Sequence, residues 1–488
     1  MTAHLTVIGI GADGFDGLGK EARDALASAP LVVGSTRQLE LLSPEPPAPT
    51  ARTEATAPPA PTAPPAPTAP TEPTEPPAPP APPAPPAPPA PPARRLAWPS
   101  PLEPLLDELA AGAHGDAAIL ASGDPMLHGI GSSLARRIGE AVAPDAATLT
   151  VIPHPSAFAL ACARLRWPQA ETELLSTVAR APELVARALQ PGRRLVVYVT
   201  GRDGAAALAR IVTARGFGPS RFVVLEQLGG EAEQAHEATA ESWGEREADP
   251  LHAVAIEPRP AAGTRPLATT PGLPDDAFEH DGQLTKRHVR AVTLAALAPL
   301  PGELLWDLGA GNGSIAIEWL RAVPRTRAVA FEANPARAAR IAANARELGV
   351  PELEVIEGRA PETLAAVLAP PAAPSPTQCA PAQATATRPP TAPAPRPNAI
   401  FIGGGLTALG LLDAGWQALK PGGRIVANAV TLESQALLVE ARAEHGGTLT
   451  QIAIAHAEPV GGFTGWRPQM PVVQWEARKP DSDEEPSR

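Results

Sequence analysis

The chain has 488 residues, a formal net charge of −12 and 64 prolines, but only two cysteines. The cysteine count excludes a disulfide framework, and the acidic balance argues against broad binding to nucleic acids or anionic membranes. No apolar run approaches the roughly 18 residues that span a bilayer, and the first nine residues are typical of a strand, not of a signal peptide. We therefore expect no membrane contact and a cytoplasmic location.

More than half of the prolines lie in two tracts, which we place at residues 44–94 and 369–397. Ala-Pro-Pro repeats form neither ladders nor helices and have little apolar bulk to bury, so both tracts are expected to be disordered insertions. Each tract interrupts a regular α/β pattern. The predicted organisation is therefore a domain over 1–257, a linker over 258–271, a domain over 272–478 and a disordered tail over 479–488.

Short apolar runs alternate with helical spacing through the first domain. Going along the chain, strands are expected at 5–10, 31–34, 117–121, 149–152, 195–199, 222–225 and 252–256. Helices are expected between them at 20–28, 132–141, 156–165 and 204–215. Apolar runs thus alternate with helical patterns from the start of the chain.

The second domain repeats the pattern more regularly. It begins with a predicted helix at 285–297, and strands are expected at 304–308, 328–332, 353–357, 399–403, 424–428, 449–455 and 472–476. Helices are expected at 313–321, 335–348, 361–368, 408–419 and 432–444. This alternation predicts a mainly parallel sheet with helices on both faces, and the fold class predicted for the whole chain is α/β.

A glycine loop joins the first predicted strand and helix of this α/β series. The stretch from Asp307 reads Asp-Leu-Gly-Ala-Gly-Asn-Gly, and its glycines allow a tight turn and close approach to a ligand. Glu332 ends the next strand, where a carboxylate can accept both hydroxyls of a ribose. The residues alone leave open a dinucleotide site, an S-adenosylmethionine site and a purely structural turn.

The form of this loop resembles motif I of class I methyltransferases. With the segments 272–290, 358–364 and 401–405, residues 272–478 resemble the decarboxylating precorrin methyltransferases of cobalamin biosynthesis. The resemblance implies a class I (Rossmann-like) fold and a bracing role for Asp307. It also implies that S-adenosylmethionine contacts Thr285, Gly309, Ala310, Gly311, Asn312, Gly313, Glu332 and Ala360. For Thr285 a helix N-cap is the structural alternative.

Three segments of the first domain carry a second resemblance. Glycine loops at 9–14 and 121–131 follow predicted strands, and Pro-His-Pro-Ser at 153–156 leads into an Ala-rich helix. Together they resemble the tetrapyrrole methylase family, which holds the donor between two α/β lobes. The resemblance implies that the donor contacts Gly123, Asp124, Pro125, Ser156 and Ala157. Asp13 would lie near the tetrapyrrole, although an ordinary turn aspartate is the alternative.

The order of the two resemblances implies a bifunctional enzyme. It would transfer two methyl groups to bridging carbons of a corrinoid precursor and release carbon dioxide from an acetate side chain. Asp13, Asp124 and Arg467 are weak catalytic candidates, and no metal site is expected. A homo-oligomer is expected, and the loop 461–468 could cap the cleft. Because the substrate carries many carboxylates, arginines near the clefts are candidate contacts: Arg136, Arg137, Arg164, Arg287, Arg290 and Arg467.

Two alternatives stay open. Related tetrapyrrole methylases carry Ser-Leu-His-Gly-Arg where this chain reads Ser-Thr-Val-Ala-Arg at 176–180, so the C-terminal site could be the only active one. The second alternative is not an enzyme. The Pro-x-x-Pro spacing of the first tract would suit an interaction protein whose Pro-rich segment docks into the aromatic grooves of partner proteins.

Overall fold

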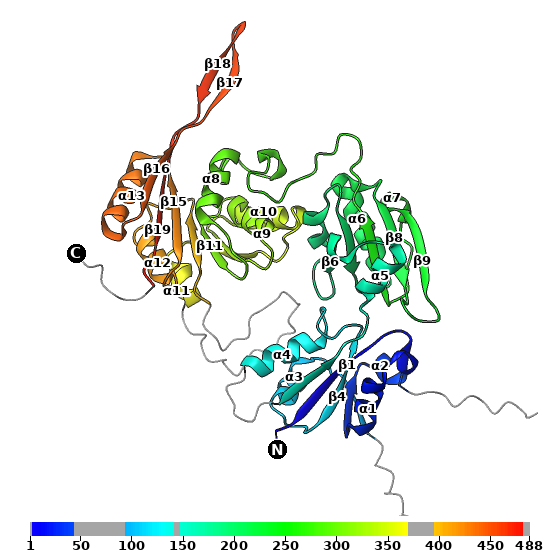
Figure 1. The fold of residues 1–488 in the computed structure, drawn as a ribbon. Coiled ribbons are helices and arrows are strands. Elements are labelled where there is room, and N and C mark those ends of the chain that lie inside the picture. The colour runs from blue at the N-terminus through cyan, green and yellow to red at the C-terminus, as the bar shows by residue number, and fades with distance from the viewer. Residues whose placement is uncertain (1, 43–92, 141–146, 369–394, 482–488) are drawn as a thin grey trace, which may run out of the picture. The chain divides into compact units, whose positions relative to one another are not determined.

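The computed structural model describes residues 2–42, 93–140, 147–368 and 395–481 (Figure 1). The two Pro-rich insertions lie almost entirely outside these residues. Contacts divide the chain into two compact units, Met1–Leu160 with Leu228–Ala232, and Ala161–Gln227 with Glu233–Arg488. The linker at 258–271 stays a prediction, because the second unit runs through it. No helix in the described part of the chain is long and apolar enough to cross a bilayer.

The first unit contains a five-stranded parallel sheet in the order β3-β2-β4-β1-β5. Its strands are β1 (His4–Ile10), β2 (Leu31–Gly34), β3 (Arg94–Ala97), β4 (Ala117–Ser122) and β5 (Thr148–Ile152). Its helices are α1 (Lys20–Ser28), α2 (Thr36–Glu40), α3 (Glu103–Ala110) and α4 (Ile130–Glu140), and α5 (Ala157–Leu165) leads into the second unit. Leucines of α3 and α4 cover one face of the sheet, and α1 and α2 cover the other.

The second unit begins with a mixed sheet in the order β6-β7-β10-β8-β9. Its strands are β6 (Thr172–Ser176), β7 (Arg194–Tyr198), β8 (Arg221–Glu226), β9 (Gln234–Thr239) and β10 (His252–Glu257), and its helices include α6 (Gly204–Val212) and α7 (Ala240–Trp243). The sequence did not predict β6 or β9. Both are edge strands, and exposed residues dominate β9, so the apolar alternation that identifies a strand is missing.

A seven-stranded sheet follows in the order β13-β12-β11-β14-β15-β19-β16, in which β19 runs antiparallel to both of its neighbours, β15 and β16. Its strands are β11 (Leu304–Leu308), β12 (Arg327–Glu332), β13 (Glu354–Glu357), β14 (Ala399–Ile402), β15 (Arg424–Ala429), β16 (Thr448–Ile452) and β19 (Val472–Arg478). On one face lie α8 (Arg287–Leu297), α9 (Ser314–Ala322) and α10 (Pro335–Glu347). On the other lie α11 (Glu362–Leu368), α12 (Leu411–Ala418) and α13 (Leu432–His445). The class I (Rossmann-like) fold is confirmed.

A β-hairpin occupies the stretch that was predicted to be a capping loop. β17 (Ala455–Val460) and β18 (Phe463–Pro468) pair across the two-residue turn Gly461-Gly462 and extend from the sheet as an arm (Figure 1). Val460, Phe463 and Trp466 are 63%, 84% and 77% exposed. The arm therefore presents apolar side chains to solvent.

A buried ion pair holds the segment that precedes α8. Arg290 is fully buried, and its Nε lies 2.5 Å from Oε1 of buried Glu318. The same guanidinium donates to the carbonyls of Leu273 and Thr285, and Glu318 accepts the amide of Leu273 at 3.0 Å. Arg290 was a candidate for contact with substrate, but it is a structural residue of the core.

The turn that follows β6 contains an alanine in a left-handed backbone conformation. β6 ends in a turn where the amide and hydroxyl of Thr177 both donate to the carbonyl of Tyr198. Ala179 in this turn has a φ of +55°. It stands where the related methylases carry glycine, so the turn keeps a backbone that suits glycine and bears a side chain there.

Ala179→Gly should raise the free energy of unfolding by about 1 kcal/mol, because glycine adopts a positive φ without the steric penalty of Cβ. Urea unfolding measures the change. The matched control is Ala181→Gly, at a φ of −65°, which should lower stability instead. Equal effects of the two substitutions would contradict the explanation.

Candidate active site

A cavity of about 870 Å³ opens in the second unit where β11, β12, β14 and β15 end. Loops that follow these strands line it, and residues 282–286 ahead of α8 form a further wall. Parallel strands bring their carboxyl ends to one edge of a sheet, which is where open α/β sheets bind ligands.

The glycine loop forms the floor of this cavity. The amides of Gly309 and Ala310 both donate to the carbonyl of Phe331 at 3.0 Å. Gly309 has a φ of +66°, and a Cβ there would lie 2.5 Å from the carbonyl oxygen of Gly404. Only glycine fits this crossing of two backbones.

Glu332 lies beside this loop on the cavity wall. It is 6% exposed, and its two oxygens accept the amides of Gly311 at 2.8 Å and Asn334 at 2.9 Å. Each carboxylate oxygen can accept a second hydrogen bond, so Glu332 keeps capacity for a pair of hydroxyls.

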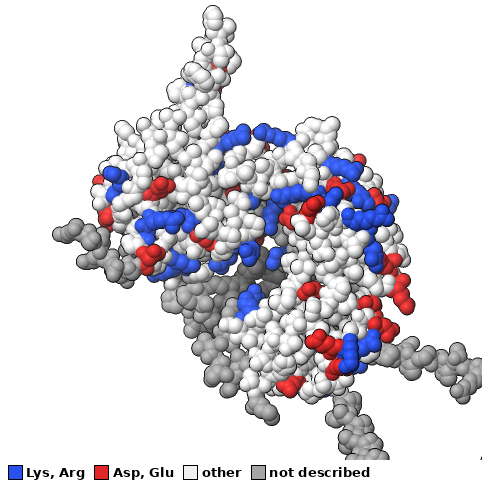
Figure 2. Space-filling view, viewed as in Figure 1, with Lys and Arg blue, Asp and Glu red and all other residues white. Residues whose placement is uncertain are grey.

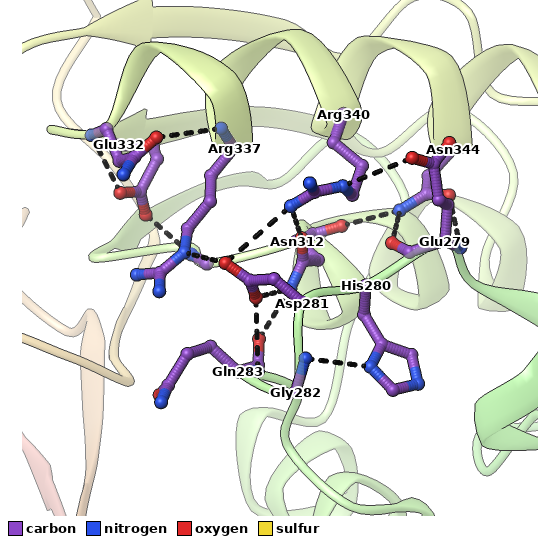
Figure 3. Close-up of polar contacts among 12 residues, drawn as sticks. Glu279, His280, Asp281, Gly282, Gln283, Asn312, Glu332, Arg337, Arg340 and Asn344 are labelled. Atoms are coloured by element: carbon purple, nitrogen blue, oxygen red, sulfur yellow. Dashed lines mark hydrogen bonds and ion pairs between the residues drawn. The ribbon is translucent and has the colours of Figure 1, made fainter.

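A polar clamp fixes the wall at 279–285 to the helices behind it (Figure 3). Asp281 accepts from Nε of Arg337 at 2.7 Å and from Nδ2 of Asn312 at 3.2 Å. Arg340 donates to Oδ1 of Asn312 at 3.0 Å, and Asn344 donates to the carbonyl of Glu279 at 3.0 Å. We call these residues, with Glu279, the clamp.

Charge reinforces the clamp. The hydrogen bond from the Arg337 guanidinium, and to a smaller extent the one from the Asn312 amide, holds the pKa of Asp281 well below its usual range. Asp281 is therefore ionised at neutral pH, and its ion pair with Arg337 persists across the physiological range.

Six of the eight donor residues predicted for this domain line the cavity: Thr285, Gly309, Ala310, Gly311, Glu332 and Ala360. Asn312 does not, because it is buried within the clamp, and Gly313 packs against Ile341. Lys286, not Thr285, is the N-cap of α8, so the structural alternative for Thr285 is not observed.

The sequence analysis missed several residues that line the cavity. They include Lys286, Arg337, Arg359, Asn428, Gln469 and Met470. Position offers a signal for two of them, since Lys286 follows Thr285 directly and Arg337 lies five residues after Glu332. Asn428 at the end of β15 carries no comparable motif.

Asp307 contacts α9 and not the glycine loop that it was expected to brace. It is 1% exposed, and its Oδ2 accepts the amide of Ala316 at 3.1 Å. Its Oδ1 has no hydrogen-bond partner among the described residues. Burial, with a smaller contribution from Glu332, raises the pKa of Asp307 to about 7.

The first unit brings a second set of glycine loops together at the ends of β1, β4 and β5. A Cβ at Gly9 would lie 2.4 Å from the carbonyl oxygen of Gly123 and 2.7 Å from Cβ of His154. A Cβ at Gly123 would lie 3.2 Å from Cα of Ser156. Three segments that are far apart in the sequence therefore meet with little room for side chains.

Two polar side chains at this edge of the sheet already accept hydrogen bonds from nearby backbone amides. Asp124 accepts the amide of Met126 at 2.8 Å, and Ser156 accepts the amide of Ala159 at 3.1 Å. Asp13 lies 3.5 Å from Nε2 of His154 and is 35% exposed. Asp13 is thus the more accessible of the two aspartates proposed as catalytic candidates, because the carboxylate of Asp124 stabilises its own turn.

None of the six candidate arginines is among the described residues that line the C-terminal cavity. Most have partners within the protein. Arg137 pairs with Asp107, Arg164 with Glu233, Arg467 with Glu458, and Arg287 donates to the carbonyl of Gly272. Arg136 is exposed on α4.

Family models match both halves of the chain. Tetrapyrrole (Corrin/Porphyrin) Methylases match residues 4–243, and the Precorrin methyltransferase domain matches 276–373 and 380–479. A precorrin-6Y C(5,15)-methyltransferase (decarboxylating) of Sinorhizobium sp is 40% identical over 475 residues, or 97% of this chain and 96% of that protein. The protein of the same name from Mycobacterium tuberculosis (strain CDC 1551 / Oshkosh) is 38% identical over 478 residues, or 97% of this chain and 100% of that protein.

Among solved structures, the C-terminal domain of precorrin-6Y C5,15-methyltransferase from Rhodobacter capsulatus is 42% identical. The match covers 44% of this chain and 100% of that chain, with a TM-score of 0.36.

Asp307→Asn should flatten the pH dependence of stability. The folded protein holds the Asp307 proton up to about pH 7, whereas the ordinary pKa is 3.8. This contribution to stability is therefore complete below about pH 4 and is lost as the pH rises towards 7. From pH 4 to pH 8, the unfolding free energy of the variant minus that of the wild type should therefore rise by about 4 kcal/mol.

Urea unfolding at several pH values measures this shift. Asp413→Asn, at an exposed position of α12, is the matched control and should leave the pH profile of the wild type unchanged. Parallel profiles for Asp307→Asn and the wild type would refute the assignment.

Proposed function

Because the chain belongs to the family of the decarboxylating precorrin-6Y C5,15-methyltransferases, we propose that it methylates precorrin-6Y at C5 and C15 and decarboxylates an acetate side chain. The observation that carries this proposal is the end-to-end match to relatives of that name, which includes both glycine-rich edges in one chain. The methyl donor would be S-adenosylmethionine. Methylation at C5 is assigned to the N-terminal site, and decarboxylation with methylation at C15 to the C-terminal site.

The C-terminal cavity suits this donor. S-Adenosylmethionine supplies an activated methyl group when bound. Glu332 would accept the ribose hydroxyls, and Gly309 and Gly311 would let the backbone approach the donor closely. Thr285 and Ala360 would complete the walls on either side.

The methyl transfer depends more on alignment of donor and acceptor than on acid or base catalysis. An electron-rich bridging carbon can attack the donor directly, so the protein must align the two partners and exclude water. No histidine or cysteine is found among the described residues that line the cavity, which suits such a reaction. The cations along the wall are Lys286, Arg337 and Arg359, and they would face the carboxylates of donor and substrate.

Activity of the N-terminal site is part of the proposal. Ala179 keeps a left-handed backbone at the position where related methylases carry glycine, so the turn shape is retained without the motif. Gly123 and Ser156 lie in contact at the edge that would hold the donor. The alternative is that only the C-terminal site is active.

The two sites can be separated by variants of the full chain. Gly309→Val would drive a side chain into Gly404, and Gly123→Val would do the same towards Ser156. We expect neither variant alone to form the doubly methylated, decarboxylated product, because each lacks one site. A mixture of the two variants should form it, because each supplies the site that the other lacks.

Mass spectrometry of the product from precorrin-6Y and the donor is the measurement. Doubly methylated product from Gly123→Val alone would refute N-terminal activity, and a single methyl gain by the wild type would favour the alternative. A wild type that neither methylates nor decarboxylates precorrin-6Y would refute the proposed function itself.

We also propose that the chain forms a homo-oligomer through the arm β17–β18. The visible face of the arm is almost free of charged side chains (Figure 2). Val460, Phe463 and Trp466 of the arm are all more than half exposed. Exposed apolar side chains gathered on one short hairpin are typical of a protein interface.

Replacing both Phe463 and Trp466 with serine should convert the oligomer to monomers, because it removes the two largest apolar side chains of the arm. Analytical ultracentrifugation measures the mass. Leu432→Ser, at a position of α13 that is 79% exposed, is the control and should leave the mass unchanged. A monomeric wild type would refute the proposal.

A further inference from the structure

Three polar side chains meet in the core beside the C-terminal cavity. They are Thr293 of α8, Asn428 of β15 and Gln474 of β19, and we call them the triad. Thr293 is fully buried and Gln474 is 4% exposed. Asn428 and Gln474 are directly opposite each other in the antiparallel ladder, so they share one face of the sheet.

The hydrogen bonds of the triad leave a free N–H on one member only. Thr293 donates to the carbonyl of Val289 at 2.8 Å and accepts from Nδ2 of Asn428 at 2.9 Å and Nε2 of Gln474 at 3.1 Å. Nε2 of Gln474 also donates to Oδ1 of Asn428 at 2.9 Å. The Thr293 hydroxyl and the Gln474 amino group are then fully used. Asn428 keeps one N–H and one lone pair, and it alone of the three lines the cavity.

The order of the strands places Asn428 at the far end of the cavity from Glu332. Glu332 ends β12, the glycine loop follows β11, and Asn428 lies near the end of β15. Three strand spacings separate the ends of β12 and β15, which is about 14 Å. A donor anchored at Glu332 and laid across β11 would point its methyl group towards β14 and β15. Asn428 therefore lies where the acceptor would bind.

The charges of the cavity differ between its two ends. Arg337 and Arg359 follow β12 and β13, on the side of Glu332. The third cation of the lining is Lys286, the N-cap of α8, which lies seven residues before Thr293 and so about 10 Å from it along the helix. Asn428 itself is neutral and held in one orientation by its two partners. A buried polar triad costs stability that apolar side chains would avoid, so a role for the fixed amide explains its presence.

We propose, on the basis of the proposed function, that the Asn428 amide holds the acetate carboxylate that leaves as carbon dioxide. The bond between the acetate methylene carbon and the carboxylate carbon breaks, and its electron pair stays on the methylene carbon in conjugation with the macrocycle. A proton from water then converts this carbon to a methyl group. The amide N–H orients the carboxylate so that the breaking bond overlaps with the ring π system.

The neutrality of the amide is part of this inference. An arginine would stabilise the localised charge of the carboxylate more than the dispersed charge of the transition state, and the reaction would slow. An amide orients the same group with a weaker hydrogen bond. Lys286 is left to bind a carboxylate that the product retains.

Variants of the full chain test the proposal with precorrin-6Y and the donor. Asn428→Asp has the same shape but repels the carboxylate, and it should lower the rate of carbon dioxide release about a hundredfold. Asn428→Ala should lower it about tenfold. Affinity for S-adenosylhomocysteine, measured by calorimetry, should stay within about twofold of the wild type in both variants, because Glu332 and the glycine loop are distant.

Thr293→Val tests positioning, since it loosens the amide without lining the cavity. It should lower kcat for carbon dioxide release several-fold while KM for precorrin-6Y changes little. Thr448→Val, at an exposed position of β16, is the matched control and should release carbon dioxide at the wild-type rate.

Carbon dioxide release at the wild-type rate by both Asn428 variants would overturn the inference. So would a parallel loss of S-adenosylhomocysteine affinity, which would point to a purely structural role, or a loss of release in Lys286→Met with none in Asn428→Ala. These outcomes require an active wild type, so they are distinct from failure of the proposed function, in which the wild type itself releases nothing.

Discussion

The ion pair between Arg290 and Glu318 is the interaction on which the C-terminal site depends. Removing two charges from water is costly unless their remaining donors and acceptors are satisfied. Here the guanidinium also donates to two backbone carbonyls and the carboxylate accepts two backbone amides. The irregular backbone therefore supplies the hydrogen bonds that water would otherwise make. The pair thereby ties Gly272, Leu273 and Thr285 to the core formed by α8 and α9.

The clamp secures the middle of the same segment. Asp281 binds the glycine loop through Asn312 and α10 through Arg337. The wall at 279–285 is thus attached at several points to the two elements that form the floor and back of the cavity. A reaction that relies on the alignment of two partners benefits from such a wall, because a displaced wall would misalign both.

The sequence predicted the features that depend on neighbouring residues. Strand ends, glycine loops and Glu332 follow from short patterns, and the resemblance located the walls at Thr285 and Ala360. The sequence could not reveal that Arg290 is buried, because its burial depends on the ion pair with Glu318, 28 residues later. The triad joins residues 293, 428 and 474, and no local pattern links them. The arm was missed because its two strands pair only with each other and cover no core.

The crossing of Gly309 and Gly404 has a consequence for how this protein can vary. Most tight contacts tolerate change because a larger residue on one side can be matched by a smaller one on the other. Here both partners are already glycine, and the contact is with backbone on each side. No compensating pair of substitutions exists, so the loops after β11 and β14 must keep this crossing while their surroundings drift.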